Sequence, residues 1–212
     1  MRDRRPAWPL VVFAGAALAG QVKTRLIPAL GADGATALHR QLVLRTLRRA
    51  RAARGARVEL WIAGERRQRF VQACGERFRV GLHEQRGSDL GQRMAHAFAH
   101  VLGRSDASGR CVLVGSDCPA QTVQDLEQAA GALDAHDLVL QPAQDGGYVL
   151  IGLRSVRPEL FEAIAWGSDR VLDQTVQRAA SLGLTLWRLR TVPDLDTEAD
   201  LQHARAQGWI ES

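Results

Sequence analysis

Short runs of consecutive apolar residues recur along this chain, and each ends at glycine, proline or a polar residue. Such runs are typical of strands that are buried on both faces of a mostly parallel sheet. They predict strands at residues 10–14, 58–63, 79–83, 111–114, 137–143, 148–153 and 185–190. Segments with apolar residues three or four positions apart separate most of these runs and predict helices. The alternation predicts an α/β protein whose strands are joined by crossovers of one hand.

The predicted helices have apolar faces that would cover the sheet. Asp33 is the predicted N-cap of the first helix, and the others are expected at 66–74, after 86–94, at 123–133, at 171–182 and after 192–201. The helix after 86–94 would bury Leu90 together with Met94, Ala97, Phe98 and Val101. No linker or low-complexity tract interrupts the 212 residues, so we expect one domain over residues 1–212.

The charged residues are distributed unevenly. The sequence has 28 Lys plus Arg against 23 Asp plus Glu, and basic residues dominate up to Arg110 while acidic residues dominate after it. This pattern favours a site with one wall for phosphates and one wall for a metal ion; the alternative is a basic arm that binds nucleic acid. The arginines of residues 45–57 lie on one predicted helix with few aromatic residues. They indicate a solvated helix face, and we expect no nucleic-acid partner.

Cysteine usage and the amino-terminal pattern bear on the compartment. Cys74, Cys111 and Cys118 lack CxxC spacing, which argues against a disulfide framework and a zinc site. They suit a reducing compartment, so we expect a cytoplasmic protein. Residues 1–20 imitate a secretory signal, although residues 10–14 serve better as a first strand. No apolar run approaches the roughly 20 residues of a membrane span, so we expect no membrane association.

Asp117 directly follows the apolar run at residues 111–114, in the sequence GSDCP. The first polar groups after a buried parallel strand lie where open α/β sheets bind ligands. Asp117 is therefore predicted at the mouth of a crevice, and the alternative is an ordinary turn residue beside Pro119.

The loop at residues 15–25 follows the first predicted strand and carries Lys23 and Arg25. Small residues let backbone N–H groups approach an anion, and the cations neutralise it, so the loop is predicted to bind phosphates. Lys23 is the only lysine in the chain, which suggests that a compact ammonium is needed there. A P-loop is disfavoured, because Lys23 comes too late after Gly20 and Pro28 follows. The absence of GxGxxG disfavours a dinucleotide-binding dehydrogenase.

Further carboxylates follow the later strands. Asp145, Gly146 and Gly147 separate two apolar runs, where glycines let a ligand approach the backbone; the alternative is a β-turn. Asp194 and Asp196 are two positions apart, so both side chains would point to the same side of an extended segment. The alternative is that Asp196 only caps the last helix.

Four polar residues of the segment 86–100 also have two interpretations. Asp89 and Arg93 are candidates for the site, although Asp89 also fits a helix cap and Arg93 a surface position. His96 and His100 have the spacing of helical metal ligands, but without an acidic neighbour a solvent-facing pair is favoured.

The carboxyl ends of parallel strands meet at one edge of a sheet, so the phosphate loop, Asp117, Asp194 and Asp196 should converge there. Carboxylate oxygens together with nucleotide phosphates suit Mg²⁺ or Mn²⁺.

A specific resemblance is carried by six ordered segments, which are FAGAALAGQVKTRL, GSDLGQRM, VGSDCPA, PAQDGGYVLIGL, WGSDRVL and DLDTEADL. Together they resemble the bacterial radical SAM/selenodomain-associated transferases, a family of the GT-A (nucleotide-diphospho-sugar transferase) superfamily, over residues 10–201. More distantly the chain is similar to 2-phospho-lactate guanylyltransferase, molybdenum cofactor guanylyltransferase and the sugar nucleotidyltransferases.

The resemblance implies a Rossmann-like α/β/α sandwich of GT-A type, with one or more antiparallel strands in a mostly parallel sheet. The implied nucleotide-binding residues are Ala14, Gly15, Gly20, Lys23, Arg25, Asp89 and Arg93; the implied metal ligands are Asp117, Asp194 and Asp196. The implied acceptor-binding residues are Asp145, Gly146, Gly147, Tyr148 and Ser168. The chain departs from the family in its first loop, where Gly15, Ala17 and Ala19 replace a cation and two prolines.

These features predict a transferase that depends on a divalent metal and uses a nucleoside triphosphate or a nucleotide sugar with a small-molecule acceptor. In the favoured reaction a phosphorylated acceptor attacks the α-phosphorus and pyrophosphate leaves, with Lys23, Arg25 and Asp117 as the catalytic residues. Glycosyl transfer with Asp145 as the base and a non-catalytic nucleotide sensor are the alternatives.

Overall fold

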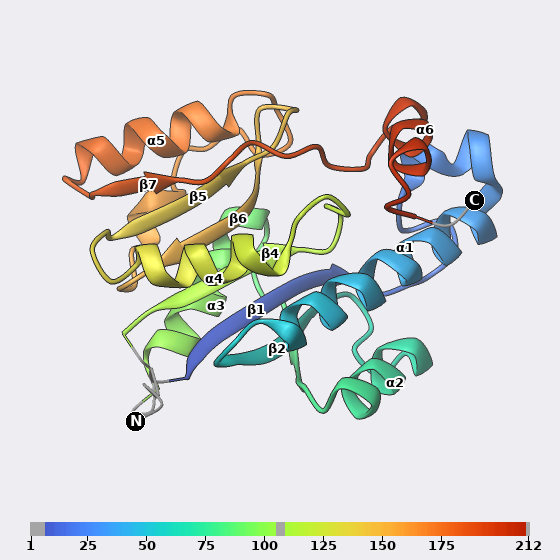
Figure 1. The fold of residues 1–212 in the computed structure, drawn as a ribbon, viewed down its shortest axis with the longest axis horizontal. Coiled ribbons are helices and arrows are strands. Elements are labelled where there is room, and N and C mark those ends of the chain that lie inside the picture. Colours follow the sequence, from blue (N-terminus) through green and yellow to red (C-terminus); the bar gives the residue numbers. More distant parts are fainter. Residues whose placement is uncertain (1–6, 105–108, 211–212) are drawn as a thin grey trace.

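Seven strands form one mixed sheet at the centre of the protein (Figure 1). The structure is a computed structural model and describes residues 7–104 and 109–210. The sheet order is β3-β2-β1-β4-β6-β5-β7, and only β6 runs antiparallel to its neighbours among the described strands. The strands are β1 (Trp8–Gly15), β2 (Ala56–Ala63), β3 (Gly81–Glu84), β4 (Cys111–Gly115), β5 (Leu138–Pro142), β6 (Tyr148–Leu153) and β7 (Leu186–Arg188). The predicted mostly parallel α/β sheet with an antiparallel strand is confirmed.

Helices cover both faces of the sheet. They are α1 (Ile27–Ala52), α2 (Arg69–Phe78), α3 (Leu90–Leu102), α4 (Val123–Ala132), α5 (Val171–Ser181) and α6 (Glu198–Ala206), with 3-10 turns η1 (Thr24–Leu26) and η2 (Pro158–Phe161). In Figure 1, α1 and α4 cross in front of the strands and α3 lies behind them. Along β1, Leu10 and Val12 pack on the layer of α1 and α4, while Val11 and Phe13 pack on the layer of α3. The alternation of side chains along a strand thus supplies both core layers.

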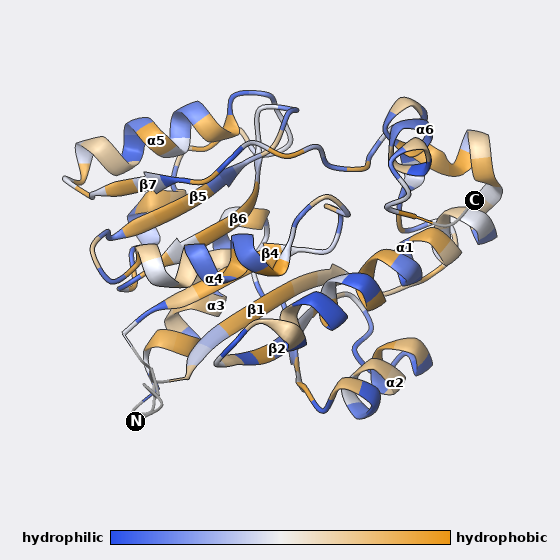
Figure 2. Ribbon diagram, in the orientation of Figure 1, coloured by the Kyte–Doolittle hydropathy of each residue, from blue (hydrophilic) through white to orange (hydrophobic). Residues whose placement is uncertain are grey.

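The colouring by hydropathy shows the same arrangement. In Figure 2 the strands β1, β4 and β5 are mainly apolar, whereas α1, α2 and α5 alternate between polar and apolar residues along their length. Strands covered on both faces are apolar throughout, and a helix needs only one apolar stripe. Within the described ranges, no helix combines the length and the hydropathy that crossing a membrane requires.

The carboxyl-terminal part of the chain crosses the carboxyl edge of the sheet. After β7 an extended segment, here called the strap (residues 189–197), runs to α6 (Figure 1). Leu201 and Ala204 of α6 share a hydrophobic cluster with Leu26 of η1 and with Leu38 and Leu42 of α1. The strap is therefore fixed at both ends and carries Asp194 and Asp196 over the edge.

Three local predictions are wrong. The first helix is not capped by Asp33: α1 starts at Ile27 and is interrupted at Gly31, whose φ of 71° only glycine adopts without strain. Leu90 is the first residue of α3 and is not core but 44% exposed. The helix expected at 66–74 starts at Arg69, because the Gln68 side chain accepts a hydrogen bond from the Val71 N–H and caps it.

Candidate functional site

Three segments that are far apart in the sequence meet at the carboxyl edge of the sheet. β1 and β4 are parallel neighbours, with Phe13 paired to Gly115, so the loops that follow them begin side by side. The Leu195 N–H of the strap donates to the Asp117 carbonyl at 3.0 Å. The loop after β1, the loop after β4 and the strap therefore form one contiguous surface, where ligands of open α/β sheets bind.

Lys23 is the residue that joins these segments. Its Nζ lies 3.1 Å from Asp117 Oδ2 and 3.0 Å from Asp196 Oδ1, and it also donates to the Leu195 carbonyl. The Lys23 side chain is only 3% exposed, while both carboxylates remain partly exposed. Burial alone would lower the pKa of Lys23, but the Asp117 and Asp196 charges outweigh it, and the net pKa is raised. Lys23 is therefore a permanently charged, buried link between two loops and the strap.

Arg25 lies beside this link and faces solvent. Its Nη1 is 3.7 Å from Asp196 Oδ2, and its side chain is 71% exposed. A guanidinium in this position has N–H groups available for a bidentate contact with a phosphate. Arg25 is thus the exposed cation of the first loop.

Side chains bind carbonyl groups at the end of β1 and in the first loop. His39 Nε2 lies 3.0 Å from the Gly15 carbonyl, Gln68 Nε2 donates to the Ala17 carbonyl at 3.1 Å, and Gln85 Nε2 donates to the Ala14 carbonyl at 3.1 Å. Burial lowers the pKa of His39, although the nearby Asp117 charge opposes this effect. Sequence analysis missed all three residues, because isolated glutamine and histidine side chains carry no recognisable motif.

The loop that carries Asp117 is held by a buried guanidinium. Arg49 of α1 donates to the carbonyl groups of Cys118, at 3.1 Å, and Gln121, and to the Thr46 hydroxyl at 3.1 Å. Burial lowers the pKa of Arg49 to about 10, which leaves it charged at neutral pH. The interpretation of residues 45–57 as a solvated helix face is therefore wrong for Arg49, which is only 8% exposed.

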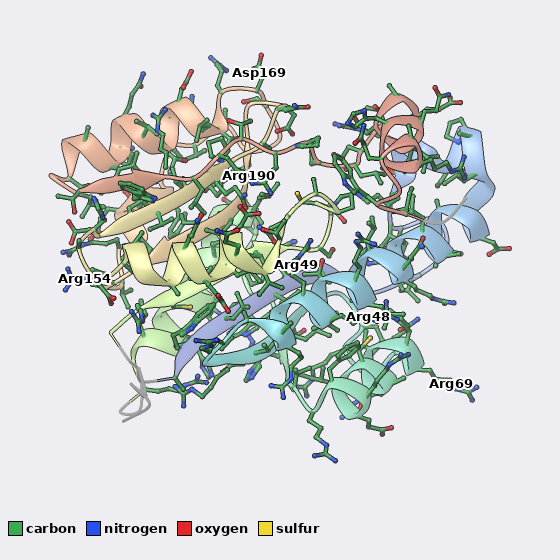
Figure 3. All side chains as sticks on the ribbon, viewed as in Figure 1. Arg48, Arg49, Arg69, Arg154, Asp169 and Arg190 are labelled. Atoms are coloured by element: carbon green, nitrogen blue, oxygen red, sulfur yellow. The ribbon has the colours of Figure 1, made fainter. Side chains whose placement is uncertain are left out.

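Arg190 fixes the beginning of the strap. Its Nε and Nη2 donate to the Asp125 carboxylate at 2.9 Å and 2.7 Å, and Nη2 also donates to the Ala120 carbonyl at 3.1 Å. Figure 3 shows Arg190 between the strap and α4. This bidentate pair adds orientation as well as charge, so it sets the path of the strap toward Lys23.

Asp194 is a half-buried carboxylate of the strap. Burial raises the pKa of Asp194 to about 6, and the neighbouring charges of Asp145 and Asp196 act in the same direction. Among the ion pairs between described residues, none includes Asp194. The ionised form of Asp194 therefore destabilises the folded state.

An Asp194→Asn variant should be more stable than the natural protein at pH 8, by on the order of 1 kcal/mol because solvent screens a half-exposed carboxylate. The raised pKa makes the cost of ionisation complete above about pH 6; the cost declines as the pH falls and disappears once Asp194 is protonated in both states, near pH 3. Urea denaturation at pH 8 and pH 3 measures the difference. The control is Asp200→Asn, because hydrogen bonds from Thr197 outweigh burial and lower the pKa of Asp200, so this variant should lose stability at pH 8. A less stable Asp194→Asn variant at pH 8 would contradict the interpretation.

The predicted acceptor segment lies next to the strap. The Gln144 N–H donates to the Val192 carbonyl at 3.2 Å, and Asp145 is near enough to affect the pKa of Asp194. Gly146 has a φ of 88°, and its backbone lies so close to the Asp169 carbonyl that an added Cβ would be 2.1 Å from that oxygen. Gly146 was expected to let a ligand approach its backbone, and in the structure the Asp169 backbone occupies that position.

Tyr148 and Ser168 make local contacts. The Tyr148 ring packs edge-on against Trp166, with 6.5 Å between the ring centroids, and burial raises the pKa of the Tyr148 hydroxyl. The Ser168 hydroxyl donates to the Ala165 carbonyl at 2.7 Å. Their predicted roles in acceptor binding stay predictions.

Asp89 and Arg93 lie at the start of α3. Asp89 Oδ1 accepts a hydrogen bond from the Gln92 N–H at 2.8 Å, and Arg93 Nε donates to the Gly87 carbonyl at 3.2 Å. Asp89 also lines a cavity of about 520 Å³ together with Trp166. Asp89 therefore acts as a helix cap, and nucleotide binding by these two residues stays a prediction.

The predicted metal ligands are only partly brought together. Oxygen atoms of Asp117, Asp194 and Asp196 have the chemistry that Mg²⁺ and Mn²⁺ prefer. In residues 7–104 and 109–210, however, no group of three His, Cys, Asp or Glu side chains is placed to hold a metal ion. The position between Asp117 and Asp196 belongs to the Lys23 ammonium. As arranged, this pair does not fit a resident metal ion.

Comparisons with solved structures identify the fold. A protein of Desulfovibrio desulfuricans G20, provisionally named a nucleotide-diphospho-sugar transferase, is 28% identical, with a TM-score of 0.82 over 98% of this chain and 100% of that chain. The 4-diphosphocytidyl-2C-methyl-D-erythritol synthase of Anaerococcus prevotii is 10% identical, with a TM-score of 0.64 over 96% and 97% of the two chains. A cytidylyltransferase of Leptospira borgpetersenii is 13% identical, with a TM-score of 0.61 over 98% and 89%. The expected GT-A-type fold is therefore confirmed.

Sequence comparisons place the chain in a family. No curated protein matches it. One family pattern matches residues 46–168, a segment that contains Asp117, Asp145 and Ser168 and covers more than half of the sequence. The chain therefore belongs to the family described as "Uncharacterized protein conserved in bacteria (DUF2064)".

Proposed function

We propose that this protein is a transferase that binds a nucleotide at the carboxyl edge of its sheet and passes the nucleotidyl group to a phosphorylated small molecule. The observation that carries the proposal is the convergence of the first loop, the Asp117 loop and the strap around Lys23. The fold shared with named nucleotide-diphospho-sugar and cytidylyl transferases supports it.

The first loop supports phosphate binding. The Gly15 and Ala17 carbonyls of the loop, and the Ala14 carbonyl just before it, are occupied by the side chains of His39, Gln68 and Gln85. The Ala16 and Leu18 N–H groups donate within the protein, and the small residues let an anion approach the remaining backbone N–H groups of the loop. Arg25 adds an exposed guanidinium beside the same loop.

The proposed reaction needs no base from the protein. An ionised phosphate oxygen of the acceptor forms a bond to the α-phosphorus as the bond to the bridging oxygen of pyrophosphate breaks in line. Arg25 would stabilise the negative charge that develops on the leaving pyrophosphate. Mg²⁺ or Mn²⁺ enters the proposal as the counter-ion that nucleotide phosphates bring with them.

Glycosyl transfer from a nucleotide sugar is the second candidate. It is favoured by the similarity to the Desulfovibrio protein, whose name refers to a nucleotide-diphospho-sugar. A neutral hydroxyl acceptor would need a base, and Asp145 is an exposed carboxylate beside the strap. The two reactions release different products, pyrophosphate in the first and a nucleoside diphosphate in the second.

The direct test is a thermal-shift panel of the four nucleoside triphosphates and the common nucleotide sugars, with and without Mg²⁺. A ligand at 100 times its dissociation constant stabilises the folded state by about 2.7 kcal/mol, which is easily detected. Product analysis with the stabilising nucleotide then separates the two reactions. If no nucleotide stabilises the protein under any of these conditions, the proposal is wrong.

An Arg25→Gln variant should bind the stabilising nucleotide about tenfold more weakly, because it loses a charge-assisted contact with the phosphates worth roughly 1.4 kcal/mol. Its melting temperature without ligand should not change, since the side chain is 71% exposed. The matched control is Arg154→Gln, an exposed arginine that follows β6 at the opposite edge of the sheet (Figure 3). Equal affinities of the Arg25 and Arg154 variants would remove Arg25 from the phosphate site.

A further inference from the structure

The three N–H groups of the Lys23 ammonium all have acceptors within the protein. These acceptors are a carboxylate oxygen of Asp117, a carboxylate oxygen of Asp196 and the Leu195 carbonyl. A lysine ammonium has no more than three donors. With only 3% of the side chain exposed, no donor of Lys23 remains for a nucleotide phosphate in this arrangement.

The backbone of Lys23 is also constrained. Its φ of 48° and ψ of 43° lie in the left-handed region, which costs a residue other than glycine on the order of 1 kcal/mol. Such a conformation persists only where surrounding contacts hold it. The contacts of Nζ with Asp117 and with the strap are of this kind, so the position of the ammonium is built into the fold.

Two carboxylates that face one position need a cation between them. Asp117 and Asp196 each direct one oxygen at Nζ, at 3.1 Å and 3.0 Å. Without a positive charge there, the two side chains would repel each other. In many nucleotide-using enzymes a divalent cation fills such a position, whereas here the cation belongs to the chain.

We propose that Lys23 replaces a divalent cation at the Asp117–Asp196 pair, so that this pair does not take up Mg²⁺ or Mn²⁺ and the ammonium locks the strap onto the Asp117 loop. The inference rests on the proposed function in treating this pair as part of the nucleotide site. Under this proposal Arg25, the exposed cation of the same loop, contacts the phosphates in place of Lys23. Removing the ammonium should then expose a cation site that the natural protein hides.

The test is Mn²⁺ binding to the nucleotide-free protein, measured from the electron paramagnetic resonance signal of free Mn²⁺. Lys23→Met keeps the unbranched side chain as far as the ε position and removes the ammonium. We expect this variant to bind one Mn²⁺ at least tenfold more tightly than the natural protein, and Lys23→Met/Asp117→Asn to lose that gain. Arg154→Met is the matched control, because it removes an exposed cation at the opposite edge of the sheet and should leave Mn²⁺ binding at the natural level.

Two results would overturn the inference. One is a folded Lys23→Met variant, checked by circular dichroism, with no gain in Mn²⁺ affinity. The other is natural protein that binds Mn²⁺ more tightly than its Asp117→Asn variant, a comparison that does not require the Lys23 variant to fold. The thermal shift with nucleotides is read separately, so a protein that binds no nucleotide refutes the proposed function without deciding the Mn²⁺ result.

Discussion

Replacing Arg49 with methionine should lower the free energy of unfolding by about 4 kcal/mol. The variant leaves the buried carbonyl groups of Cys118 and Gln121 and the Thr46 hydroxyl without their donor. Each unsatisfied buried acceptor costs about 1–3 kcal/mol, and methionine keeps the aliphatic part of the side chain without replacing any hydrogen bond. Urea denaturation at neutral pH measures the loss. Because the same carbonyls belong to the Asp117 loop, the variant should also bind nucleotide more weakly.

The neighbouring arginine provides the control. Figure 3 shows Arg49 on the side of α1 that faces the loop after β4 and Arg48 on the opposite side. Arg48 is exposed, so Arg48→Met should change the free energy of unfolding by less than about 0.5 kcal/mol. Equal losses in the two variants would show that the contacts of Arg49 with the Asp117 loop do not stabilise the protein.

Replacing Gly146 with alanine should cost about 4 kcal/mol of the free energy of unfolding. The new Cβ would lie 2.1 Å from the Asp169 carbonyl oxygen, and the φ of 88° is strained for any residue with a side chain. The clash is between two backbone segments, and the Leu172 N–H also donates to the Gly146 carbonyl at 2.9 Å. Thermal or urea denaturation measures the loss.

Gly147→Ala is the matched control for this clash. Its Cβ would meet only the movable Asp145 carboxylate, at 3.2 Å, and its φ is not positive. We expect a loss below about 1 kcal/mol. If both alanine variants are equally stable, the segment around Asp169 (labelled in Figure 3) does not pack on Gly146 as described.

Much of the fold follows from patterns that a single sequence contains. Strands covered by helices on both faces must be apolar throughout, so β1, β4 and β6 were expected within a residue or two of their observed bounds. Because parallel strands end at a shared edge, Asp117 and the strap were expected near the first loop, and the Lys23 contacts show that they meet.

What sequence analysis missed depends on which way individual side chains point. A sequence pattern does not distinguish a buried arginine of a helix from an exposed one. Arg49 is a buried donor only because α1 packs against the Asp117 loop. Lys23 was expected to face phosphates, because it lies in a loop rich in small residues. Nothing in that loop indicates that the Lys23 side chain turns back to contact Asp196, 173 residues later in the sequence. Leu90 has the apolar spacing of α3 but is exposed at the first position of that helix.

The contact between Lys23 and Asp196 closes a loop of the chain that includes every described strand except β1, which precedes Lys23. During synthesis the amino-terminal parts of a protein emerge and fold first. A nascent chain that has emerged only as far as Arg190 therefore holds the complete set of described strands, with Lys23 still lacking its partners in the strap. Binding of the proposed nucleotide should therefore begin only once the strap has emerged and met Lys23.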